Sequence, residues 1–108
     1  MATVIAISGQ VSVTTAGAAV KFTTTPPGLY EIKPLGGNTG TYIYVGNDGS
    51  TTGDVTSSNG YQLKKGLDTL LISVTNLNQL WLDADTSGDG ACFVRVSAEN
   101  NSITPPAA

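Results

Sequence analysis

The stretch LWLDADTSGDGACFVRVS, residues 80–97, does most to decide the fold. Its two ends alternate apolar side chains with other residues, and this period of two is typical of β-strands. The middle, Ser87-Gly88-Asp89-Gly90, gathers residue types that favour turns and left-handed backbone angles. The stretch therefore predicts two strands, over 80–84 and 92–97, joined by a hairpin loop.

The same pattern of short strands and turn clusters recurs along the rest of the chain. Good helix formers do not accumulate, because glycine or a β-branched residue interrupts almost every ten-residue window. The 108 residues therefore predict one all-β domain over 1–99, a small antiparallel β-sandwich or β-barrel. Residues 100–108, with two prolines and no periodicity, are expected to form an extended C-terminal tail. Further strands are expected over 3–7, 11–14, 20–24, 29–33, 41–45, 61–63 and 69–74.

Alternation also predicts which side chains form the core. The opposite faces of the same strands then carry four aromatic residues, Tyr42, Tyr44, Trp81 and Phe93. Two interpretations of these aromatic residues stay open: a second sheet or a loop covers them, or they form a contact surface for a partner. The expected core rows are Leu80 and Leu82, then Cys92, Val94 and Val96, then Leu70, Ile72 and Val74, and finally Ile43 and Val45.

Composition narrows the classes of partner. Charged residues make up 12% of the chain and the net charge is −3, so the surface does little to repel other protein molecules. Binding to nucleic acid is disfavoured because Lys64-Lys65 is the only basic pair. No apolar run approaches the roughly 20 residues of a membrane-spanning helix. The first residues lack the basic region and the apolar length of a signal peptide, so we expect none.

Side-chain chemistry argues against an enzyme. The chain has no histidine, which is the commonest general base and zinc ligand. Cys92 is the only cysteine, so no intrachain disulfide can form, and we interpret it as a buried strand residue in a protein made in a reducing cytoplasm. Carboxylate pairs can act as in glycosidases, but so short a β-rich chain has little room for a substrate cleft. We expect a non-enzymatic protein without a cofactor.

One segment could bind a metal. The run from Asp83 to Gly90 matches the opening of a calcium loop, in which alternate oxygen side chains converge before a sharp glycine turn. The match is partial, because Val94 occupies the position of the bidentate glutamate and the flanks read as strands. A hairpin loop is the preferred interpretation, and calcium binding remains the alternative. The candidate ligands are Asp83, Asp85, Ser87 and Asp89.

Three segments follow one another in an order of strand and turn motifs that is similar to that of known proteins: YIYVGN at 42–47, NGYQLKKG at 59–66 and LWLDAD at 80–85. Through a strand with a VGN turn, a GxxLxxG turn and a strand that ends in acidic residues, residues 40–97 resemble small structural proteins of tailed phages. The resemblance implies a β-sandwich or β-barrel on the virion, of capsid-decoration or head-fibre type. It implies no catalytic residues.

The leading hypothesis is a virion structural protein assembled in the host cytoplasm. It is expected to be a capsid decoration (cement) or head-associated protein that binds the major capsid protein lattice, as a homo-oligomer such as a trimer. Tyr42, Tyr44, Trp81 and Phe93 are the predicted interface residues. One alternative is a carbohydrate-binding or adhesin-like module, in which Trp81 stacks on sugar rings. The other is a self-assembling filament or lattice subunit.

Overall fold

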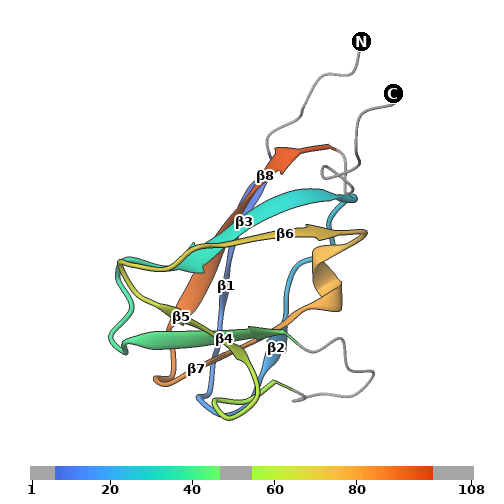
Figure 1. Cartoon of the computed structure of the whole chain (residues 1–108). Helices are drawn as coiled ribbons and strands as arrows, with labels where there is room; N and C mark the ends of the chain where they lie inside the picture. Colours follow the sequence, from blue (N-terminus) through green and yellow to red (C-terminus); the bar gives the residue numbers. More distant parts are fainter. Residues whose placement is uncertain (1–6, 47–54, 99–108) are drawn as a thin grey trace.

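The computed structural model describes residues 7–46 and 55–98, in which the strands form two four-stranded sheets. Sheet A has the order β1-β8-β3-β6, and sheet B has the order β2-β7-β4-β5. In Figure 1, β8, β3 and β6 lie in the upper layer, and β4, β5 and β7 lie in the lower one. The elements are β1 Ser8–Ser12, β2 Val20–Lys21, β3 Gly28–Pro34, β4 Tyr42–Gly46, β5 Tyr61–Lys64, β6 Leu70–Val74, the 3-10 helix η1 Leu77–Gln79, β7 Trp81–Ala84 and β8 Gly90–Ser97.

The strands pair as one long hairpin that is folded over on itself. β1 pairs with β8, β2 with β7, β3 with β6 and β4 with β5, and every pair is antiparallel. Two further ladders, β3 with β8 and β4 with β7, join these pairs into the two sheets. Eight strands in this nested order form a jelly roll, a double-sheet architecture of two Greek keys. The predicted all-β class is confirmed, and of its two variants the chain forms the sandwich.

Side chains from the inner faces of both sheets fill the main core. Alternation is regular in β3, where Tyr30 and Ile32 are fully buried and Glu31 between them is exposed. The ring of Phe93 from β8 lies edge-on to Phe22 and Tyr30, with centroid distances of 6.5 Å and 6.2 Å. Each fully buried side chain of this size stabilises the fold by about 1.5–3 kcal/mol. The core therefore depends on contacts between the two layers.

Three of the four expected core rows are confirmed, and the row in the last strand is wrong. Phe93 and Ala91 point into the core, whereas Cys92 and Val94 are partly buried and Val96 is 45% exposed. Both faces of this strand are apolar, so alternation cannot choose between them. Burying the aromatic ring removes more apolar surface from water than burying the smaller side chains. The confirmed residues are Ile43, Val45, Val74, Leu80 and Leu82, with Leu70 and Ile72 packed against them.

The predicted hairpin over 80–97 is also wrong. β7 belongs to sheet B and β8 to sheet A, so their connection crosses from one layer to the other. The nested order requires this crossing, because β8 pairs with β1 and β3. A turn cluster between two strands indicates a reversal of the chain but does not say whether the strands share a sheet.

Two expected strands have different bounds. The strand expected over 11–14 is β1, which begins at Ser8, and the strand expected over 20–24 shortens to β2. The strand expected over 3–7 and the tail expected over 100–108 lie outside the described residues, except for Ile7. Its carbonyl oxygen accepts a hydrogen bond from the Arg95 N–H at 2.8 Å, which continues the ladder between β1 and β8.

Candidate binding surfaces

Trp81 and Tyr44 lie on the outer face of sheet B beneath neighbouring loops. Each is 6% exposed, and they pack with Ala19 and Val55 in a second apolar cluster, to which Tyr42 adds a partly buried ring. Ala19 precedes β2, and Val55 lies in the connection between β4 and β5. Of the two interpretations of these aromatic residues, the structure shows the one in which a loop covers them.

The second cluster carries polar contacts at its rim. The Tyr44 hydroxyl donates a hydrogen bond to Asp85 Oδ1 at 2.7 Å. Burial, followed by this hydrogen bond and by the negative charges of Asp85 and Asp83, raises the pKa of Tyr44 to about 12. The Lys21 ammonium lies 5.5 Å from the centre of the Trp81 ring, at the distance of a cation–π contact. These contacts hold both aromatic residues in the sheet.

The four predicted interface residues therefore do not form one exposed surface. Trp81 and Tyr44 belong to the second cluster with Tyr42, whereas Phe93 belongs to the main core between the sheets. Phe93 is 5% exposed and Tyr42 is partly buried. As placed, they offer a partner little apolar surface. An apolar residue on an alternating strand indicates that its side chain is buried. The sequence does not indicate which loop covers it.

The end of β7 and the acidic loop after it anchor a neighbouring turn through hydrogen bonds. Asp83 Oδ1 accepts hydrogen bonds from the Gly17 N–H at 2.9 Å and from the Ala84 N–H at 2.8 Å. Ser87 Oγ accepts one from the Ala16 N–H at 2.9 Å. These bonds fix the turn before β2, which lies far from the acidic loop in sequence. Asp83 is 3% exposed, so its carboxylate acts as a buried acceptor for backbone N–H groups.

Asp89 holds the connection between β3 and β4 in a similar way. Its Oδ1 accepts a hydrogen bond from the Thr39 N–H at 2.9 Å, and its Oδ2 accepts one from the Gly40 N–H at 2.7 Å. The four candidate calcium ligands thus bond to three separate segments: Asp83 and Ser87 to the turn before β2, Asp85 to β4, and Asp89 to the connection between β3 and β4. In the part of the chain that the structure describes, no three His, Cys, Asp or Glu side chains are grouped to hold a metal ion. The structure assigns these residues a role in closing one end of the sandwich.

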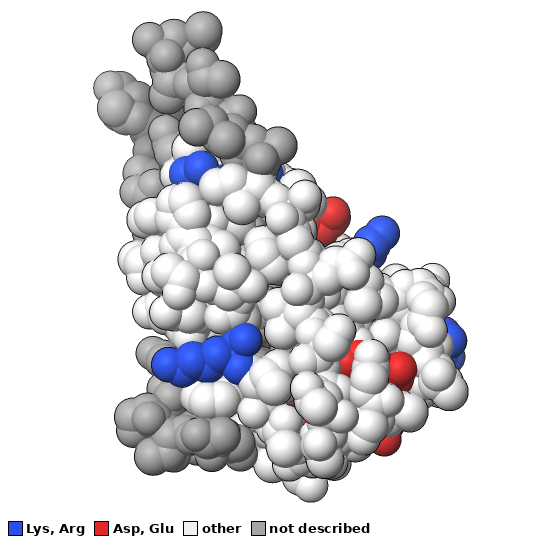
Figure 2. Space-filling model, turned by 180° about the vertical axis from the view of Figure 1, so that it is seen from behind, with Lys and Arg blue, Asp and Glu red and all other residues white. Residues whose placement is uncertain are grey.

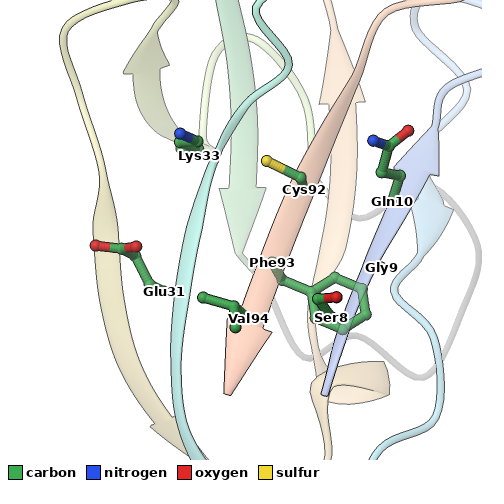
Figure 3. A pocket seen from close by; sticks show the side chains of 8 residues that line it. All are labelled: Ser8, Gly9, Gln10, Glu31, Lys33, Cys92, Phe93 and Val94. Atoms are coloured by element: carbon green, nitrogen blue, oxygen red, sulfur yellow. The ribbon is translucent and has the colours of Figure 1, made fainter. Parts of the chain in front are cut away.

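A shallow groove runs along the outer face of sheet A (Figure 3). It has a volume of about 360 Å³. Its floor is β8, with Cys92 and Val94, and β1 contributes Gln10 to one side. Glu31 and Lys33 of β3 form the other side, and both side chains are exposed. Sequence reasoning missed this groove, although the alternation of these two charges with buried Tyr30 and Ile32 gives their outward direction.

The most exposed large apolar side chains lie elsewhere than on the predicted aromatic face. Tyr61 at the start of β5 is 61% exposed and Leu67 in the turn after it is 73% exposed. Leu71 and Val96 of sheet A are 58% and 45% exposed. Figure 2 shows charged side chains as isolated groups separated by uncharged surface. The surface around Tyr61 and Leu67 and the surface around Leu71 and Val96 can each bury apolar area against a partner.

Comparisons of this chain with protein-family models, with curated proteins and with solved structures find no match. Among residues 7–46 and 55–98, no helix is long and apolar enough to cross a membrane. The functional inference therefore rests on the topology and on the surfaces just described.

Proposed function

We propose that this chain is a non-enzymatic structural protein of a tailed-phage virion that binds the capsid surface as a decoration or head-associated protein. The observation that carries the proposal is the nested strand order, which makes the chain a jelly roll. Viral capsid domains share this architecture with lectins and cupins. The support is a fold-level analogy, and it agrees with the independent resemblance of the 40–97 segment to phage structural proteins.

The use of the polar side chains supports a structural role. The carboxylates of Asp83, Asp85 and Asp89 accept hydrogen bonds from protein donors, which is a positioning task. Asp68 Oδ2 likewise accepts a hydrogen bond from the Lys64 N–H at 2.9 Å, at the edge strand of sheet B. General acid–base catalysis needs a side chain that reaches a substrate proton. Four of the chain's acidic groups instead hold its own loops and edge.

The side of the sandwich at β5 is the proposed contact with the capsid. Tyr61 is the first residue of this edge strand and Leu67 lies in the turn after it, and both are more than half exposed to solvent. Aromatic and aliphatic side chains of this kind form the buried centre of protein interfaces. When several copies are joined in one oligomer, their weak contacts with a repeating shell add up through multivalency. A small apolar contact per copy is then sufficient for stable attachment.

Co-sedimentation with purified capsids that lack this chain tests the proposal. The wild-type protein should pellet with capsids, and Tyr61→Ser combined with Leu67→Ser should leave most of the protein in the supernatant. Lys64→Ser is the matched control, because it changes an exposed residue of the same strand without removing apolar contact area. A wild-type protein that stays wholly in the supernatant under native salt contradicts the proposal, provided that circular dichroism shows it folded.

Burial of Trp81 weakens the carbohydrate-binding alternative. A sugar ring needs the open face of an aromatic side chain, and Trp81 is 6% exposed beneath the loop that contains Ala19. Tyr61 is the one aromatic residue of the described segments that is more than half exposed. A glycan array on which wild-type protein binds and Tyr61→Ser does not would favour this alternative over capsid binding.

A further inference from the structure

The outer faces of the two sheets differ in how they are covered. On sheet B, Ala19 and Val55 pack over Trp81 and Tyr44. On sheet A, the outward side chains stay accessible, and Leu71 keeps 58% of its surface exposed. An accessible sheet face with apolar side chains is a site where further association removes apolar surface from water. Sheet A is therefore the face left for a partner.

This face carries one negative and one positive side chain. Glu31 and Lys33 both point outward from β3, two residues apart. Arg95 is the third charged residue within the strands of sheet A, but it is level with buried Tyr30 and its guanidinium donates to the Pro27 carbonyl oxygen at 2.9 Å. The outward charges described for this sheet are thus a single pair of opposite signs on one strand, with Cα atoms roughly 7 Å apart.

We propose that two copies of this chain associate through the outer faces of their A sheets. The two copies are related by a two-fold axis in the plane between their A sheets. The axis runs at right angles to β3 and passes over Ile32, so the strands of one copy run opposite to those of the second copy. Glu31 of each copy then faces Lys33 of the second copy, and the pairing occurs twice. A sheet face with two charges of one sign could not match itself in this way.

The neighbouring strands follow the same symmetry. In β8, Val94 is level with Glu31 and Cys92 is level with Lys33. The axis therefore also passes over β8 midway between Val94 and Cys92. Val94 of one copy then faces Cys92 of the second copy, and the grooves of Figure 3 close against each other. The small apolar side chains on the groove floors leave water in this arrangement. The rims are polar and charged, as expected for an interface edge.

The size of the face predicts weak association. Four strands about 4.8 Å apart and about five residues long cover roughly 350 Å² per copy. A stable interface buries about 800 Å² per partner. The dimer is therefore expected to dissociate on dilution and to weaken as salt screens the two charge pairs. On a capsid, attachment of each copy to the shell would raise the effective concentration.

Sedimentation equilibrium of the purified protein over a range of concentrations, at low salt and with a reducing agent, tests the proposal. Wild-type protein should form a concentration-dependent dimer. Glu31→Lys and Lys33→Glu each place like charges opposite each other twice, and each should raise the dimer dissociation constant about tenfold or more. An equimolar mixture of the two variants should form heterodimers, and the double variant E31K/K33E should dimerise like wild type.

Lys64→Glu is the control, because it makes the same charge change on an exposed residue of sheet B. It should leave the dimer unchanged. A monomeric wild-type protein at its highest soluble concentration overturns the inference, as does a dimer that both single variants retain. This inference goes beyond the proposed function, because it specifies a dimer as the homo-oligomer that the sequence analysis expects. Its failure is separable, because the dimer is measured without capsids and capsid binding is measured through Tyr61 and Leu67.

Discussion

The side chain of Asn38 pairs with the backbone of Gly90 through two hydrogen bonds, as a neighbouring strand would. Its Nδ2 donates to the Gly90 carbonyl oxygen at 2.8 Å, and its Oδ1 accepts from the Gly90 N–H at 2.9 Å. The two residues are 52 positions apart in the sequence, and Asn38 is 6% exposed. This pair ties the connection between β3 and β4 to the start of β8, where the chain crosses between the sheets.

Replacing Asn38 with alanine should destabilise the fold by about 1–3 kcal/mol, because it leaves the buried Gly90 N–H without its acceptor. The Gly90 carbonyl oxygen keeps the hydrogen bond that it accepts from the Leu35 N–H at 3.0 Å. Urea denaturation gives the free energy of unfolding. Asn78→Ala is the control, since the Asn78 side chain makes only a long, exposed contact with Thr24 at 3.4 Å, and its effect should stay below about 0.5 kcal/mol. Equal effects of the two variants would contradict the role of Asn38.

Gly60 should be intolerant of a methyl group. A Cβ there would lie 2.6 Å from both Tyr44 Cβ and Val55 Cγ2, so Gly60→Ala should cost about 1–3 kcal/mol through overpacking of the second cluster. Gly37→Ala provides the comparison, because a Cβ at Gly37 meets nothing within 4 Å. It should be neutral or stabilising by up to about 1 kcal/mol. Thermal unfolding of both variants measures the difference, and a neutral Gly60→Ala would show that the loop does not pack on Tyr44.

Stability should fall at high pH through Tyr44. Its pKa is raised from 10.0 to about 12 in the folded chain, so the unfolded chain releases the proton first as pH rises. The stabilising contribution is complete below pH 10 and is lost progressively between pH 10 and 12. Tyr44→Phe removes this contribution but not those of other tyrosines and lysines. A wild-type-to-variant difference that is constant from neutral pH to pH 12 would contradict the raised pKa.

Calcium should not stabilise the protein. The oxygen atoms of Asp83, Asp85, Ser87 and Asp89 already accept hydrogen bonds from protein donors in three segments, so metal binding would have to break those contacts. Melting temperatures in millimolar calcium and in a chelator are expected to agree. If the loop bound calcium, a calcium concentration of a hundred times the Kd would raise the free energy of unfolding by about 2.7 kcal/mol. Such a rise would restore the calcium interpretation of this loop.

Local patterns predicted the strands well and their assembly poorly. Alternation and the turn clusters located β3, β4, β6 and β7 to within about two residues. Alternation failed in β8, where the face of Phe93 and Ala91 competes with the equally apolar face of Cys92 and Val94. The layer of each strand depends on long-range pairing, which no short pattern contains. For that reason the connection between β7 and β8 was predicted as a hairpin.

The candidate sites show the same limit. Asp83 and Asp89 stand in a calcium-like order along the chain, but their partners, Gly17 and Thr39, are residues of distant loops. Trp81 was predicted at an interface because aromatic residues are rare on solvated faces, and the loop above it supplies the burial. Alternation predicts that Glu31 and Lys33 point outward from β3. Their place in a contact between two copies can be inferred only from the structure, in which no loop of the described segments covers this face of sheet A.

Peptide mass spectrometry of density-purified phage particles tests the proposed virion role most directly. We expect peptides of this chain in the particle band at a constant ratio to the major capsid protein, because a decoration protein occupies repeated sites on the shell. Washing at native salt should not change that ratio. A chain found only in the particle-free fraction of the lysate, with capsid protein present in the band, would contradict the proposed function.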